Sequence, residues 1–290
     1  MKIVRWYALV LVLISFAIAA QDDVAYRSQP VYLVEVLKKL KSGENVTFAK
    51  FGDGEYLCMS QEYLRTGGEA HNCDGDQYHP WLSAALKNAF VSLCKKPNTY
   101  IGRWHTINSG AKPAAIDAYY IGCARAHGAE IPFVSYHLIM NDDSFLCYPY
   151  MHELVEFLVN TKRKKIVMGN ARNRPLKELF RADVYVEIPP RSWSLEYDTW
   201  KDIVMSHLEP DAILLTAGGL CSKVLINEVT NHYDMTCLDI GSAFDIIGGN
   251  CFSRSPRYHT YQDELNYYHD LLPKGYHVQR GSSSRGVSPE

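Results

Sequence analysis

The chain has 290 residues, of which 47% are hydrophobic and 21% are charged, and its formal net charge is -2. This length suits one large domain or two small ones, and the composition is ample for a packed core. General nucleic-acid binders carry a basic footprint that this chain lacks, so we exclude that class and expect no nucleic-acid partner.

The first twenty residues have the layout of a secretory signal. Lys2 and Arg5 precede an apolar run over residues 6–20, and polar Gln21 follows it. The run is shorter than the roughly twenty residues that a membrane span usually needs. We therefore expect residues 1–20 to be a cleaved signal peptide or, if uncleaved, a single-pass type II anchor. Either case places the remaining chain in the ER or Golgi lumen or outside the cell, and membrane contact arises only through that anchor.

Cysteine usage agrees with an oxidising compartment. The chain holds eight cysteines and no Cys-x-x-Cys pair, so disulfide bonds are expected and a structural zinc site is disfavoured. An even number permits full pairing, but the connectivity stays open. Asn45-Val46-Thr47 is a glycosylation sequon, which predicts a glycoprotein if Asn45 lies in an exposed loop.

The beginning of the mature chain leads to a short acidic segment. Residues 21–30 are typical of a linker, and residues 31–41 have the apolar spacing of a helix. A short apolar run over residues 47–51 then ends in Gly-Asp-Gly-Glu at residues 52–55, which we call the acidic turn. This pattern predicts a strand followed by a tight turn, with a helix over residues 56–64 packed behind it.

Helical and strand patterns alternate along the rest of the chain. Expected helices cover residues 80–93, 113–127, 150–159, 176–180, 196–207 and a segment from about 221, and expected strands cover residues 100–102, 131–136, 164–168, 184–188, 211–215 and 236–241. This alternation predicts an α/β fold of the Rossmann-like kind, with a mostly parallel sheet and helices on both faces. We expect one domain over residues 31–278 and a disordered tail over residues 279–290.

Glycines and polar residues follow four of the predicted strands. They are Gly52 to Glu55, Gly169 to Arg172, Gly218-Gly219, and Asp239 to Asp245. Ligands of parallel sheets bind outside the carboxyl ends of the strands. The sequence therefore predicts a binding site at this edge of the sheet.

Asp53 and Glu55 are the first candidates for chemistry at that edge. Carboxylates one residue apart in a turn can share one hard cation, and the flanking glycines allow a ligand to approach the backbone. The alternative interpretation is a surface turn with two solvated acids.

Two further segments have the composition of anion-binding loops. The segment Gly169-Asn170-Ala171-Arg172-Asn173-Arg174 offers backbone N–H groups at a helix start and two guanidinium groups, although a helix cap with solvated arginines is the alternative. Gly218-Gly219 with the nearby Lys223 is similar. Neither segment is a Walker loop or a Gly-x-Gly-x-x-Gly loop, which disfavours ordinary dinucleotide binding, and the chain has no Gly-x-Ser-x-Gly elbow of an α/β-hydrolase.

Three blocks together resemble the GT-D type glycosyltransferases, first catalogued as a domain of unknown function in bacterial glycan clusters. The blocks are residues 49–55, the Asn-Cys-Asp-Gly loop at residues 72–75 with its following helix, and residues 214–219 leading into Leu-Asp-Ile-Gly at 238–241. Lys50 stands where the family usually has arginine, and Ser242-Ala243-Phe244-Asp245 replaces the family's aromatic residues. The resemblance covers roughly residues 50–245.

The resemblance implies a metal-dependent glycosyltransferase, either a hexosyl- or a pentosyltransferase. Such an enzyme takes a sugar from a nucleotide-diphosphate sugar, here expected to be a UDP-sugar, and adds it to a glycan or glycoprotein acceptor. By this match Asp53 and Glu55 bind Mn²⁺ or Mg²⁺ and take part in catalysis. From strand-end placement, the residues expected at the donor are Gly52, Gly54, Gly169, Asn170, Arg172, Gly218, Gly219, Lys223 and Asp239. Asp245, or else Asp239, is the candidate base for the acceptor hydroxyl.

Two other functions remain open from the sequence. One is a carbohydrate- or nucleotide-binding protein that keeps the fold without turnover. The other is a Rossmann-like methyltransferase, which the glycine-rich strand ends suggest although the usual early Gly-x-Gly loop is missing.

Overall fold

The computed structural model describes residues 32–66, 70–72, 75–103, 111–131, 134–135, 148–241 and 270–271. The predictions for the signal segment, the linker, the C-terminal tail and Asp245 concern residues outside these ranges. Within these ranges, no helix is both long and apolar enough to cross a membrane.

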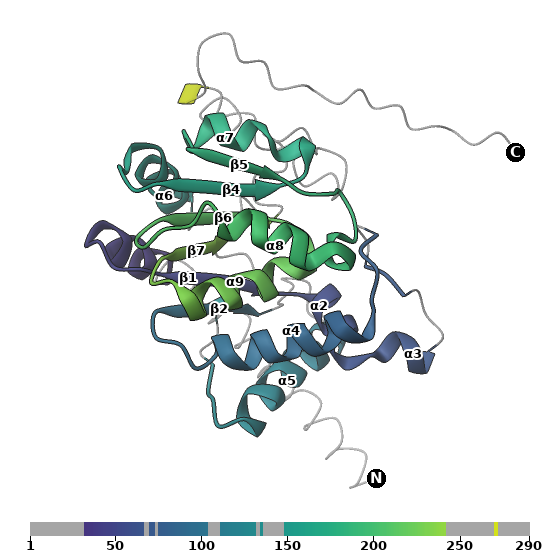
Figure 1. Cartoon of the computed structure of the whole chain (residues 1–290). Coiled ribbons are helices and arrows are strands. Elements are labelled where there is room, and N and C mark those ends of the chain that lie inside the picture. Colours follow the sequence, from purple (N-terminus) through teal and green to yellow (C-terminus); the bar gives the residue numbers. More distant parts are fainter. Residues whose placement is uncertain are drawn as a thin grey trace, which may run out of the picture.

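A seven-stranded sheet forms the centre of the described chain, in the order β3-β2-β1-β7-β6-β4-β5 (Figure 1). Every pair of neighbouring strands is parallel. The strands are β1 (Thr47–Phe51), β2 (Thr99–Arg103), β3 (Val134–Ser135), β4 (Lys165–Gly169), β5 (Val184–Glu187), β6 (Ile213–Ala217) and β7 (Thr236–Asp239). The parallel sheet that the alternating pattern predicts is confirmed.

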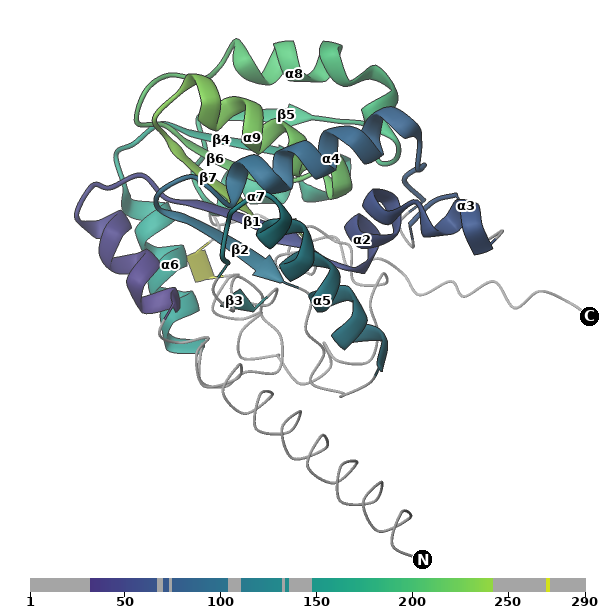
Figure 2. The same cartoon turned by 90° about the horizontal axis from the view of Figure 1, so that it is seen from below.

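Helices cover both faces of this sheet, as expected (Figures 1 and 2). One face packs against a helix over residues 32–41, α6 (Tyr148–Asn160) and α7 (Pro175–Leu179). The other face packs against α2 (Asp53–Ser60), α4 (Pro80–Leu93), α5 (Ala111–Ala126), α8 (Tyr197–Met205) and α9 (Ser222–His232). The short elements are α3 (Glu62–Thr66) and the 3₁₀ turns η1 (Ala171–Asn173), η2 (Trp193–Glu196) and η3 (Gly219–Cys221). Strands covered on both sides explain the continuous apolar runs in the sequence.

The helix after the acidic turn begins earlier than the pattern predicts. It begins at Asp53 rather than at residue 56, so the acidic turn is itself the first turn of α2. Gly52 is the N-cap, and the Glu55 side chain accepts a hydrogen bond from the Gly52 N–H at 2.8 Å. A glutamate three residues after the N-cap is the acceptor half of a capping box, which accounts for the early start.

Asn45 of the sequon lies at the amino end of the sheet and is bonded there. Its Nδ2 donates to Asp234 Oδ1 at 3.0 Å, and its Oδ1 accepts from Thr236 Oγ1 at 3.2 Å and from the Arg163 guanidinium. The half-buried side chain thus ties the starts of β1, β4 and β7 together. It does not have the setting of an exposed loop on which the glycosylation prediction depended.

Replacing Asn45 with alanine is expected to lower the free energy of unfolding by about 1–3 kcal/mol, because the buried Thr236 and the partly buried Arg163 lose a hydrogen-bond acceptor. Urea titration measures this loss. Asn160→Ala is the matched control, since that exposed side chain bonds only within its own helix among the described contacts, and it should change stability much less. Equal losses in the two variants would contradict the structural role of Asn45.

The structure has no disulfide bond within the residues that it describes, so the disulfide bonds expected from the cysteine usage are not found there. Five of the eight cysteines lie there, and all five are free thiols: Cys58, Cys94, Cys123, Cys221 and Cys237. All five thiols pack in or against the apolar interior, where a cysteine behaves as a small hydrophobic residue. Cys73, Cys147 and Cys251 lie outside the described residues.

The buried thiols are expected to resist alkylation in the native protein. Burial is the main cause that raises the pKa of Cys58 and of Cys237 to about 12, so hardly any reactive thiolate forms at pH 8. Unfolded cysteine titrates near pH ~8.5, so the stability contributed by these protonated thiols is present below that pH and is lost as the pH rises toward 12. Mass spectrometry after iodoacetamide treatment tests this expectation by comparing the labelling of the native protein with that of the urea-unfolded protein. Rapid native labelling of Cys237 would contradict it.

Candidate functional site

The strand register brings most of the predicted site residues to one edge of the sheet. At the carboxyl ends, Gly169 of β4 pairs with Ala217 of β6, and Thr216 of β6 pairs with Asp239 of β7. β1 pairs with β7 on its other side and leads directly into the acidic turn. The acidic turn, the loop after β4, the glycines after β6 and Asp239 therefore lie along the same edge.

Two adjacent strands at this edge send their chains to opposite faces of the sheet. β4 leads through η1 into α7 on one face, whereas β6 leads through η3 into α9 on the other. Such a topological switch point is where open α/β sheets bind ligands, because the two loops separate there. The predicted donor loops flank this point.

The acidic turn contacts the segment over residues 218–221, which we call the glycine turn. A Cβ atom at Gly54 would lie 3.3 Å from Leu220 Cδ2 and 3.5 Å from Asn72 Cβ, so the absence of a side chain permits this close packing. From the other side, Tyr120 Oη of α5 donates a hydrogen bond to the Gly52 carbonyl at 2.6 Å. The backbone of the acidic turn is thus held by packing on two sides.

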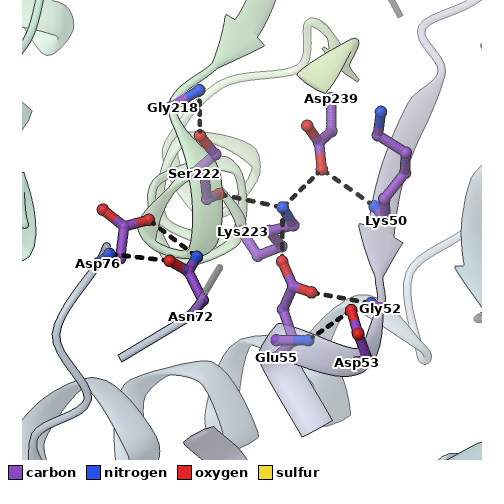
Figure 3. Close-up of polar contacts among 12 residues, drawn as sticks. Lys50, Gly52, Asp53, Glu55, Asn72, Asp76, Gly218, Ser222, Lys223 and Asp239 are labelled. Atoms are coloured by element: carbon purple, nitrogen blue, oxygen red, sulfur yellow. Dashed lines mark hydrogen bonds and ion pairs between the residues drawn. The ribbon is translucent and has the colours of Figure 1, made fainter. Parts of the chain in front are cut away.

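Lys223 joins three of these segments through its buried ammonium group (Figure 3). Its Nζ lies 2.9 Å from Glu55 Oε1 and 2.9 Å from Asp239 Oδ2, and it donates to the Gly219 carbonyl at 3.0 Å. The exposed fractions of the three side chains are 5% for Lys223, 5% for Glu55 and 1% for Asp239. The structure therefore brings Glu55, Lys223 and Asp239 together, but inside the protein.

Lys50 lies on the next strand and is also buried. Its backbone N–H donates to Asp239 Oδ2 at 3.2 Å, and its Nζ donates to the Ile240 carbonyl at 2.9 Å. Gly241 has a positive φ of 45°, and a Cβ there would lie 2.5 Å from Lys50 Nζ. The lysine that replaces the family's arginine thus fills the space beside this glycine.

The glycine turn owes its two glycines to contacts within the protein. A Cβ at Gly218 would lie 2.8 Å from both Met168 Cε and Ser222 Oγ. Gly219 has a φ of 65°, which favours glycine, and a Cβ there would lie 2.5 Å from Asp76 Oδ2. Close approach of a phosphate is therefore not needed to explain either glycine.

Asp76 is a central residue of this edge that the sequence interpretation did not single out. Its Oδ1 accepts from the Ser192 N–H at 2.8 Å, and its Oδ2 accepts from Asn72 Nδ2 at 3.3 Å. Asn72 Oδ1 in turn accepts from the Asp76 N–H at 2.8 Å. The available signal was the Asn-Cys-Asp-Gly block, whose polar side chains favour such local turns.

In the loop after β4, one polar side chain bonds within the loop and another is exposed to solvent. Asn170 Oδ1 accepts from the Arg172 N–H at 2.9 Å, so Asn170 caps the η1 turn. A Cβ at Gly169 would lie 2.9 Å from Asn173 Cβ, which explains the glycine. Arg172 is exposed on this loop. Of this segment, Arg172 is thus the side chain in a position to meet a ligand.

The two carboxylates of the acidic turn differ in their fitness for a metal ion. Glu55 is buried and uses both oxygens within the protein. Asp53 is partly exposed, and within the described part of the chain its Oδ1 accepts the Gly54 N–H at 3.0 Å. No three His, Cys, Asp or Glu side chains gather into a metal-binding group within the described ranges. A cation at Asp53 would need donor phosphate oxygens as well, which is a common arrangement for Mg²⁺.

Comparison with known proteins identifies the fold. No family model matches the chain, and no curated protein matches it. A solved structure of domain of unknown function 1792, described as having a distinct glycosyltransferase fold, is similar with a TM-score of 0.54, 16% identity and 89% coverage of each chain. A selenomethionine-substituted structure of the same domain gives the same values.

A third solved structure agrees with these two. It is described as a new glycosyltransferase of this domain from Streptococcus sanguinis, and it matches with a TM-score of 0.52 and 19% identity. The match covers 73% of this chain and 80% of that one. The chain therefore has the GT-D type glycosyltransferase fold of the domain of unknown function 1792 structures.

Proposed function

We propose that the protein is a glycosyltransferase that moves a sugar from a nucleotide-diphosphate sugar to a glycan or glycoprotein acceptor. The observation that carries this proposal is the meeting of the acidic turn and the glycine turn at the carboxyl edge of a sheet with a glycosyltransferase fold. Transferases of this kind need a rigid polar surface for a diphosphate, and the internal contacts that fix the acidic turn support that role for this edge.

Asp53 is the residue we assign to the donor diphosphate and its cation. Its carboxylate lies at the start of α2 and is partly exposed. A bound Mn²⁺ or Mg²⁺ would neutralise the charge that develops on the leaving diphosphate. Arg172, on the loop across the switch point, adds a guanidinium suited to phosphate oxygens. A UDP-sugar remains the expected donor.

Asp239 is better suited to holding the site together than to acting as a base. It is completely buried, and its Oδ2 receives both the Lys223 ammonium and the Lys50 N–H. A base must reach the proton that it abstracts, either directly or through one water. We therefore keep Asp245 as the proposed base for the acceptor hydroxyl. The secretory lumen, or the outside of the cell, remains the proposed compartment because of the segment over residues 1–20.

A screen of nucleotide sugars tests the proposal. The purified protein is heated with each member of a panel of UDP-, GDP- and ADP-sugars, with and without Mn²⁺, and its unfolding midpoint is recorded. A donor at about 100 times its dissociation constant stabilises the native state by about 2.7 kcal/mol, so one or more nucleotide sugars should raise the midpoint. Stabilisation by S-adenosylmethionine alone would contradict the proposal and favour a methyltransferase.

Turnover separates a transferase from a binding protein of the same fold. Release of nucleoside diphosphate from the stabilising donor is measured with acceptor glycans and with water alone. Slow Mn²⁺-stimulated release is the expected result, because transferases commonly hydrolyse donors when no acceptor is bound. Binding with no release under any condition would favour the non-catalytic alternative.

A further inference from the structure

Glu55 faces the interior, although it belongs to the acidic turn. Its Oε2 accepts the Gly52 N–H at 2.8 Å, and its Oε1 lies 2.9 Å from Lys223 Nζ. The first contact closes the start of α2, and the second reaches across to α9. Both oxygens of Glu55 therefore take part in contacts within the protein.

The Lys223 ammonium occupies the position between two carboxylates that a cation would otherwise take. Glu55 and Asp239 each lie 2.9 Å from its Nζ, and the Gly219 carbonyl lies at 3.0 Å (Figure 3). An ammonium has three donor protons, and these three acceptors match them. A divalent ion on Glu55 would have to approach this fixed positive charge, which opposes its binding.

We propose that Glu55 is a positioning residue and not a metal ligand, and that Asp53 is the only carboxylate of the acidic turn that contacts the donor's cation. Lys223 connects Glu55 to the glycine turn and to β7, so the acidic turn keeps a fixed position relative to the switch point. The part of this inference that concerns the cation rests on the proposed function. The part that assigns Lys223 as the internal counter-ion of Glu55 and Asp239 does not depend on the proposed function.

The first test compares Mn²⁺ affinity in the presence of UDP, by electron paramagnetic resonance of free Mn²⁺, for wild type, Asp53→Asn and Glu55→Gln. Asp53→Asn is expected to weaken Mn²⁺ binding by at least about tenfold, because ligand charge sets the affinity for hard cations. Glu55→Gln is expected to stay within about threefold of wild type, since a charge outside the coordination sphere acts only at a distance. A loss in Glu55→Gln as large as that in Asp53→Asn would overturn the proposal.

The second test uses Mn²⁺ alone and does not depend on a nucleotide. Lys223→Met leaves Glu55 and Asp239 facing each other without a counter-ion, so Mn²⁺ should raise the unfolding midpoint of this variant and leave that of wild type nearly unchanged. Equal Mn²⁺ stabilisation of wild type and Lys223→Met, or no stabilisation of the variant, would overturn the assignment of Lys223. A variant that folds only when Mn²⁺ is added supports it.

The two proposals fail in different ways. A wild-type protein that is stabilised by no nucleotide sugar of the panel, with or without Mn²⁺, contradicts the proposed function, while the comparison with Mn²⁺ alone still tests Lys223. If the wild-type protein binds UDP with Mn²⁺ and the Glu55→Gln variant no longer binds Mn²⁺, only the positioning role of Glu55 is contradicted.

Discussion

Replacing Lys223 with methionine is expected to lower the free energy of unfolding by about 3–5 kcal/mol, in the absence of added metal ions. The ammonium is the counter-ion of two buried carboxylates, Glu55 and Asp239. Methionine keeps much of the side-chain volume but leaves both carboxylates without a cation, and an uncompensated buried charge is costly. Urea titration in buffer with EDTA measures the loss. A typical domain is stable by about 5–15 kcal/mol, so the effect is large.

Lys201→Met is the matched control for this variant. Lys201 Nζ lies 2.7 Å from Asp198 Oδ1, whose side chain is 85% exposed. Exposed ion pairs contribute only about 0–1 kcal/mol, so the same substitution should have little effect there. Similar stabilities for Lys223→Met and Lys201→Met would show that the buried cluster does not hold the edge of the sheet together.

Replacing Asp53 with asparagine is expected to reduce sugar transfer at least about 100-fold while the fold persists. The asparagine Oδ1 can still accept the Gly54 N–H that Asp53 Oδ1 accepts at 3.0 Å, so the start of α2 should be preserved. The lost charge removes the carboxylate that we assign to the cation, and about 3 kcal/mol of lost transition-state stabilisation corresponds to about 100-fold in rate. Release of nucleoside diphosphate from the preferred donor measures it.

Asp198→Asn is the control for Asp53→Asn. Asp198 is an exposed acid in the first turn of α8, as Asp53 is in the first turn of α2, and it has no part in the proposed site. Its variant should keep the wild-type rate. Wild-type activity in Asp53→Asn would contradict a role for Asp53 in the reaction. Unchanged thermal unfolding of both variants would show that a difference in rate does not come from a loss of stability.

Much of the fold follows from local pattern. Apolar runs that end at glycine or polar residues predict the strands, and amphipathic spacing predicts helices such as α4, which begins at Pro80 as expected. The errors lie at boundaries. β6 begins at Ile213 rather than at Asp211, because Asp211 has a left-handed backbone with a φ of 63° that no strand accepts.

The site was less predictable than the fold. Strand-end placement correctly brings the acidic turn, the glycine turn and Asp239 to one edge, because parallel strands share their carboxyl ends. No local pattern indicates that Lys223 meets Glu55, since this contact joins residues far apart in the chain and depends on how α2 and α9 both pack against α4. The spacing of Gly52 and Glu55 fits a capping box, yet a glycine N-cap provides no side chain, so the signal was weak.

The resemblance to GT-D glycosyltransferases added what pattern alone could not. The identity to the similar solved structure is 16%, and the resemblance in sequence rests on short blocks such as residues 49–55. The family's acidic pair suggests two equivalent ligands. The structure distinguishes them, because burial and the Lys223 ion pair separate the surroundings of Glu55 from those of Asp53.

A crystal structure of the wild-type protein with UDP and Mn²⁺ is the most direct test of the proposed donor site. We predict the UDP diphosphate at the carboxyl edge of the sheet, with Mn²⁺ bridging its oxygens to Asp53 and with the Lys223 ammonium still between Glu55 and Asp239. Nucleotide bound at the amino end of the strands, or at the carboxyl edge without contact to Asp53, would contradict this account.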